Sequence, residues 1–70
     1  MMIEVFKTNI KGARDARKIV LLLLQHFPAC RINVDLHDCD RILRVEGRDY
    51  SPGAIIRLVT ISGYNCARLE

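Results

Sequence analysis

The chain has 70 residues and half of them are hydrophobic, so it suits one small domain and is too apolar for a disordered chain. Its net charge of +3 is too small to indicate a nucleic-acid partner, and its longest apolar run, residues 19–24, is far shorter than the ~20 residues that span a bilayer. Three cysteines without a dense framework, and no visible signal peptide, favour free thiols in the cytoplasm. We therefore expect a single cytoplasmic domain over residues 1–70, with neither a membrane nor a nucleic acid as partner.

The first part of the chain predicts a strand followed by a helix. Ile3 and Val5 alternate with Glu4 and Phe6, which is typical of a half-buried strand. The polar residues 8–12 end it, and residues 13–27 then repeat apolar side chains at helical spacing until Pro28. The expected inner face of this helix consists of Ala13, Ala16, Val20, Leu23 and Phe27.

The second part predicts a hairpin, a helix and a last strand. Residues 31–37 alternate strictly, residues 38–40 are turn formers, and residues 41–47 read as the return strand. Ser51 and Pro52 are typical of a helix start, with Ser51 as N-cap, and Gly63 is typical of a helix end. Residues 64–69 then read as the fourth strand.

The element order is therefore βαββαβ, which predicts an α+β fold. Short connections and right-handed crossovers favour a ferredoxin-like sandwich, with a four-stranded antiparallel sheet in the order 4-1-3-2 and two helices on one face. The other face is left to water, in agreement with the polar side chains at positions 31, 33, 35 and 37.

Several segments, in this order, resemble the heavy-metal-associated domain family, which includes copper chaperones. "INVDL" resembles its second strand, "SPGAII" the start of its second helix, and "GYNCARL" its final Gly-Tyr and strand. The family binds a soft metal through Met-x-Cys-x-x-Cys after the first strand. Here Ala13 and Ala16 stand at the two cysteine positions, and Lys11 or Ile10 at the methionine position. The resemblance thus implies the scaffold without its metal motif, and we expect no cofactor.

Two other folds fit the sequence less well. "IEVFKTN" resembles the first strand of small thioredoxin-like proteins, but the redox cysteines are missing and a hairpin over residues 31–46 replaces the helix that fold requires. RNA-recognition domains stack bases on sheet aromatics, and Phe6 is the sole candidate on the two central strands. With Ile42, Phe6 instead suggests a small apolar patch on the open face of the sheet.

A substitute metal site is the alternative function. The topology places the 37–41 hairpin tip and the start of the last strand at the same end as the motif loop. His37, Cys39 and Cys66 are therefore candidate ligands for a soft ion such as Cu(I), or for Zn(II) or Hg(II). A plain turn at residues 38–40 explains the same residues and is favoured.

The first helix carries the candidate partner-binding residues. Its start is basic, although early cations oppose the helix dipole at ~0.3–1 kcal/mol each. Leu21 is expected on the outer surface among these cations, which suits an acidic protein partner or self-association. The surface consists of Lys11, Arg14, Arg17, Lys18 and Leu21. The sequence favours a non-catalytic binding module; an oligomeric small-molecule sensor is a weaker option.

Overall fold

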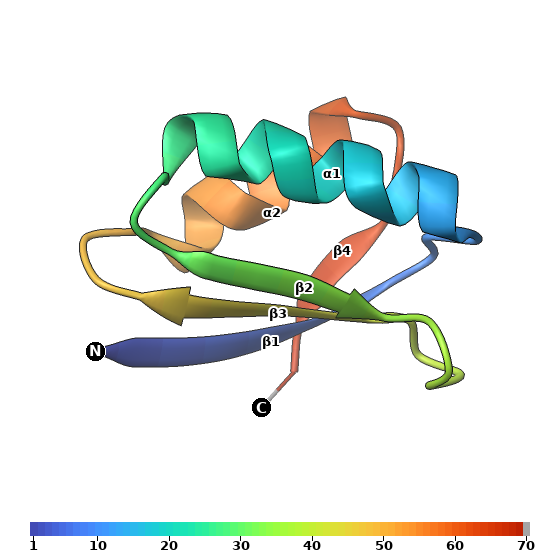
Figure 1. Cartoon of the computed structure of the whole chain (residues 1–70). Helices are drawn as coiled ribbons and strands as arrows, with labels where there is room; N and C mark the ends of the chain where they lie inside the picture. Colours follow the sequence, from blue (N-terminus) through green and yellow to red (C-terminus); the bar gives the residue numbers. More distant parts are fainter. Residues whose placement is uncertain (70) are drawn as a thin grey trace.

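Two helices cover one face of a four-stranded antiparallel sheet in the computed structural model, which describes residues 1–69 (Figure 1). The strand order is β2-β3-β1-β4, which is the expected 4-1-3-2 read from the other edge. The predicted α+β, ferredoxin-like sandwich is therefore confirmed. The elements are β1 (Met2–Thr8), α1 (Ala13–His26), β2 (Arg31–Asp35), β3 (Ile42–Gly47), α2 (Pro52–Ile61) and β4 (Cys66–Arg68).

The two faces of β1 are the reverse of what the sequence suggested. Phe6 has no exposed surface and lies opposite Leu43 of β3 in the core, whereas Ile3 is 55% exposed on the open face. The expected apolar patch of Phe6 with Ile42 is therefore wrong. Glu4 shares the inward face with Phe6 by alternation, and its carboxylate accepts two hydrogen bonds, of 2.8 and 2.9 Å, from the Arg68 guanidinium. This bidentate pair keeps both charges satisfied at the margin of the core.

The inner face of α1 is rotated slightly from the expected one. Ala16, Ile19 and Leu23 are buried, at spacings of three and four residues, while Ala13 is exposed. Ile19 was missed because every residue from 19 to 24 is apolar, so the pattern there does not define a single stripe. The helix ends as expected before Pro28, where the Phe27 N–H donates to the Leu23 carbonyl oxygen at 2.8 Å.

The helix and strand ends have local causes. Pro52 opens α2, and Gly63 follows its end with φ of +98°, a conformation that favours glycine. Ser51 is the N-cap residue, but its hydroxyl makes no capping hydrogen bond, contrary to the expectation. β2 stops at Asp35, since the Asp35 carboxylate accepts from the His37 N–H at 3.0 Å and turns the chain. Within residues 1–69, both helices fall short of the length and apolarity that a membrane span requires.

Candidate functional site

The loop between β1 and α1, where the resembling family binds metal, is held here by hydrogen bonds and packing. The buried Thr8 hydroxyl donates to the Arg41 carbonyl oxygen at 2.6 Å and accepts from the Ile10 N–H at 3.3 Å. Arg41 in turn donates from Nη1 to the Lys11 carbonyl oxygen at 3.0 Å. Ile10 is fully buried and anchors the loop in the core. The loop is therefore joined to the β2–β3 turn, which lies at the expected end of the sheet.

The two alanines of the motif positions have different surroundings. Gly12 is the N-cap of α1, and its carbonyl oxygen accepts from the Ala16 N–H at 2.9 Å. Ala16 is buried beneath the helix, whereas Ala13 is exposed. Of the two, Ala16 alone fills space in the core. An alanine methyl has no lone pair, so neither position can bind a metal ion.

The β2–β3 turn gathers the ligand atoms of Asp38, Cys39 and Asp40 within 4.8 Å of one another. Neither His37 nor Cys66 belongs to this group, so the structure does not assemble the expected ligand set of His37, Cys39 and Cys66. The carboxylates also have partners already. Asp38 accepts from the Asp40 N–H at 2.8 Å, and Asp40 pairs with Lys7 at 3.6 Å. These contacts are those of a hydrogen-bonded turn.

The three cysteines are free thiols in different environments. Cys39 is exposed, Cys30 is buried before β2, and Cys66 is half-buried on β4 opposite Thr8. Burial raises the pKa of the Cys66 thiol from 9.0 to about 11. Burial, with a contribution from Asp49, also raises the pKa of Cys30. Both thiols are consequently poor nucleophiles and poor metal ligands at neutral pH.

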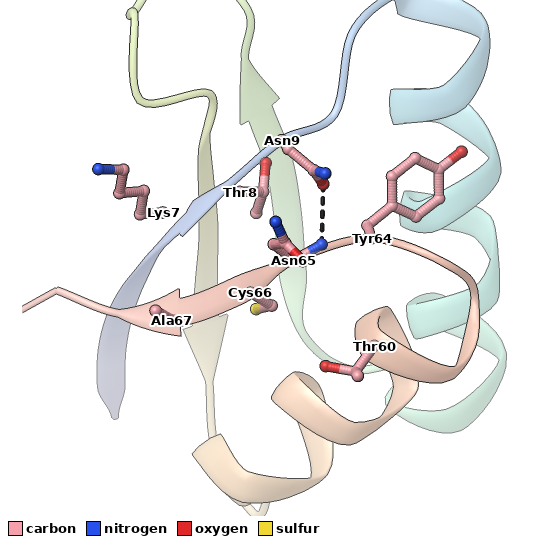
Figure 2. A pocket seen from close by; sticks show the side chains of 8 residues that line it. All are labelled: Lys7, Thr8, Asn9, Thr60, Tyr64, Asn65, Cys66 and Ala67. Carbon is pink, nitrogen blue, oxygen red and sulfur yellow. Dashed lines mark hydrogen bonds between the residues drawn. The ribbon is translucent and has the colours of Figure 1, made fainter.

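A groove of about 470 Å³ lies beside β4 and was not anticipated from the sequence (Figure 2). It is lined by residues 7–9, Thr60 and residues 64–67. Within the groove, the Asn9 side-chain oxygen accepts a hydrogen bond from the Asn65 N–H at 2.8 Å (Figure 2). This contact stabilises the fold. Asn9 and Asn65 are 56 positions apart in the chain, so no local sequence pattern predicts their contact.

The outer face of α1 presents the predicted partner-binding residues together. Arg14, Arg17 and Lys18 are exposed, and Leu21 is 55% exposed. Positions 14, 17, 18 and 21 are three or four apart, so they share one side of the helix. Within residues 1–69, none of these three cations takes part in an ion pair. Lys11 is exposed in the loop just before the helix.

Comparisons of this chain with protein-family models, with curated proteins and with solved structures gave no significant match.

Proposed function

We propose that the chain is a non-catalytic interaction domain that binds an acidic protein surface through the outer face of α1. The contact is apolar at its centre, Leu21, and basic around it, through Arg14, Arg17 and Lys18. It acts in the cytoplasm, where the three free thiols suit a reducing environment.

One observation carries the proposal: a large apolar side chain is exposed among cations that form no ion pair within residues 1–69. Leu21 is 55% exposed, on the side of α1 opposite the sheet. A single exposed leucine is ordinary on a protein surface. Leu21, however, lies within one turn of Arg17 and Lys18, which no carboxylate of the described chain neutralises. An apolar centre with a charged rim is the usual anatomy of a protein interface.

The position of Arg14 adds a physical reason. Arg14 is in the first turn of α1, where its charge opposes the positive end of the helix dipole. Asp15 is the acidic residue of that turn and offsets the charge in part. A cation retained at a position where it costs stability is expected if it contacts a partner.

Resemblance suggests the origin of this scaffold. We propose that it is a heavy-metal-associated domain that has lost the two-cysteine site and kept a charged α1 surface for docking. The loop contacts of Thr8 and Arg41, together with the buried Ile10, support this proposal. They hold the loop in place with no need for a bound ion.

Charge reversal at Arg14 tests the function, because stability and binding should change in opposite directions. Arg14→Glu places an anion at the helix N-terminus and should stabilise the fold by about 0.3–1 kcal/mol. The same variant should retain several-fold less of an acidic partner captured from cell extract by the immobilised full chain. That retention should also weaken as salt is raised.

Arg57→Glu is the matched control, since Arg57 is an exposed cation on α2, away from the proposed surface. It should leave retention unchanged. If Arg14→Glu and Arg57→Glu reduce retention equally, the interaction follows net charge and the proposed surface on α1 is wrong.

A further inference from the structure

The outer edge of β2 is an open pairing edge. In the sheet of the described residues, β2 is the last strand on its side, and no other strand pairs with its outer edge (Figure 1). Natural proteins protect such edges with proline, lysine, bulges or very short strands. β2 has five residues, Arg31–Asp35, with no proline, lysine or bulge; its two charged residues, Arg31 and Asp35, are opposite in sign, so they do not repel an identical strand. The opposite edge strand, β4, has three residues.

The sheet register identifies the backbone groups that this edge presents. The Leu69 N–H donates to the Val5 carbonyl oxygen at 2.9 Å, so Val5 directs its backbone groups toward β4. Because antiparallel pairs alternate, Arg44, opposite Val5, directs its groups toward β2 and Asn33. Asn33 therefore bonds inward to β3, and its neighbours Ile32 and Val34 direct their N–H and C=O groups to the open edge.

The charges on β2 are self-complementary about its central residue. If two copies of β2 pair antiparallel with Asn33 on a two-fold axis, Arg31 of each lies opposite Asp35 of the other. The same register places Ile32 opposite Val34, so the residues with free backbone groups face each other and can form four hydrogen bonds. Within residues 1–69, neither Arg31 nor Asp35 has an ion-pair partner.

The neighbouring registers lack this match. An axis at Ile32 puts Arg31 opposite Asn33, and an axis at Val34 puts Arg31 opposite His37. Neither of these registers places opposite charges across from each other, and charged residues directly opposite on one sheet face affect the stability of the pairing. The axis at Asn33 is therefore the favoured one.

Apolar side chains above the edge extend the surface. Ile32, Val34 and Leu36 face the core but remain partly exposed at the edge. On α1, Val20 and Leu24 are partly exposed too.

The position of these two α1 residues follows from Asp15, which lies beside Tyr64 on the side of α1 nearest the α2–β4 connection. Val20 and Leu24 are about 140° and 180° around the helix from Asp15. They therefore lie on the side of α1 away from α2, above the open edge.

We propose that a second copy of this chain pairs with β2, through Arg31–Asp35 of both copies, to form a two-fold dimer with one continuous eight-stranded sheet. The β2 strands pair antiparallel about Asn33, and the α1 helices lie side by side above them. Leu21, Arg14 and Lys18 lie about 60–120° further around α1 than Leu24, so they stay free for the acidic partner, whereas Arg17 lies at the margin of the dimer contact. An isologous contact of this kind closes on itself and does not propagate into fibres.

Charge reversal tests the pairing by sedimentation equilibrium of the full chain. The native chain should be a dimer. Arg31→Asp leaves an acidic side chain at both position 31 and position 35, and Asp35→Arg leaves a basic one at both. Like charges then face each other across the two copies, so each variant dimer should dissociate at least tenfold more readily. An equimolar mixture of the two variants should dimerise again, because the acidic strand complements the basic strand. This recovery also shows that both variants are folded.

Arg44→Asp is the control, since Arg44 is an exposed cation on the same sheet face but in the interior strand β3. It should leave the dimer intact. Amide exchange gives a second readout: the N–H groups of Ile32 and Val34 should exchange slowly in the native dimer and quickly in Arg31→Asp. A monomeric native chain overturns the proposal. A native dimer that both single reversals leave intact, or a mixture that does not recover, overturns it as well.

Discussion

The Thr8 hydroxyl lies 2.6 Å from the carbonyl oxygen of Arg41, and this hydrogen bond joins two loops that are 33 positions apart in the chain. The same hydroxyl accepts from the Ile10 N–H, so one buried side chain satisfies two backbone groups. Thr8 thus holds the β1–α1 loop, where the resembling family places its metal motif, against the β2–β3 turn.

Removal of this hydroxyl should be costly. Thr8→Val keeps the size of the side chain but leaves the Ile10 N–H unpaired in the core, at an expected loss of about 1–3 kcal/mol in the free energy of unfolding. Thr8→Ser keeps the hydroxyl, loses one methyl group and should cost about 0.8 kcal/mol. Urea unfolding measures both. Equal losses, or a larger loss for Thr8→Ser, would mean that packing of the methyl group, and not the hydrogen bond, holds the loop.

Cys66 should make stability fall at alkaline pH. Its pKa is 9.0 ordinarily and about 11 in the folded chain. Below pH 9 the thiol keeps its proton in both the folded and the unfolded chain, so the stability of the fold is at its full value. As pH rises from 9 toward 11 the unfolded chain releases the proton first, which stabilises the unfolded state and lowers the free energy of unfolding. The loss should stay below about 1.4 kcal/mol per pH unit, since Cys66 is only half-buried.

The comparison of native chain with Cys66→Ala isolates this effect. Burial also raises the pKa of Tyr50, as do nearby charges such as Glu4, and that contribution is common to both chains. Urea unfolding across the interval between the two Cys66 pKa values should give a steeper decline for the native chain. Parallel declines would show that Cys66 ionises freely in the folded state.

The sequence was sufficient for the fold because its strongest signals are periodic. The strict alternation of residues 31–35 and the stops at Pro28 and Gly63 place the elements within a few residues of their observed bounds. β1 was misjudged because it is apolar on both faces: Ile3 and Val5 on one, Phe6 on the other. In the structure Phe6 takes the core face and Glu4 shares that face by alternation, where its carboxylate pairs with Arg68, 64 positions away; no local pattern encodes that contact.

The candidate functional residues were predictable where they depend on helical spacing and unpredictable where they depend on contacts between distant segments. The basic side of α1 and the exposure of Leu21 follow from helical spacing alone, and the structure places them as expected. The convergence of His37, Cys39 and Cys66 depended on side-chain positions in the β2–β3 turn and on β4. The turn placed Asp38 and Asp40 beside Cys39 instead.

Restored cysteines test the resemblance to the heavy-metal-associated family. In a Cys39→Ser background, which removes the one exposed native thiol, Ala13→Cys with Ala16→Cys should bind Cu(I) more tightly than the background alone. Ala13→Ser with Ala16→Ser is the control. Competition with a Cu(I) chelator measures the affinity. A folded double-cysteine variant that binds no better than its serine counterpart would separate this loop geometry from that of the family.

Leu21→Ser should have little effect on the fold. Leu21 is 55% exposed, so its replacement should change the free energy of unfolding by less than about 0.5 kcal/mol, as at ordinary surface sites. Leu23→Ala, two positions on and fully buried, should cost about 2–5 kcal/mol. Chemical denaturation compares the two. A loss of about 2 kcal/mol or more for Leu21→Ser would make this residue part of the core.

We place an acidic protein against the outer face of α1, and site-specific photo-crosslinking in cells detects such a contact at a single residue. A crosslinking amino acid in place of Leu21 should capture an acidic protein, and Arg14→Glu in the same chain should reduce that capture several-fold. The same group in place of Ile61, which is 72% exposed on α2, should not capture that protein. Capture of the same protein from both positions, or from position 21 only a second copy of the chain, would contradict the claim.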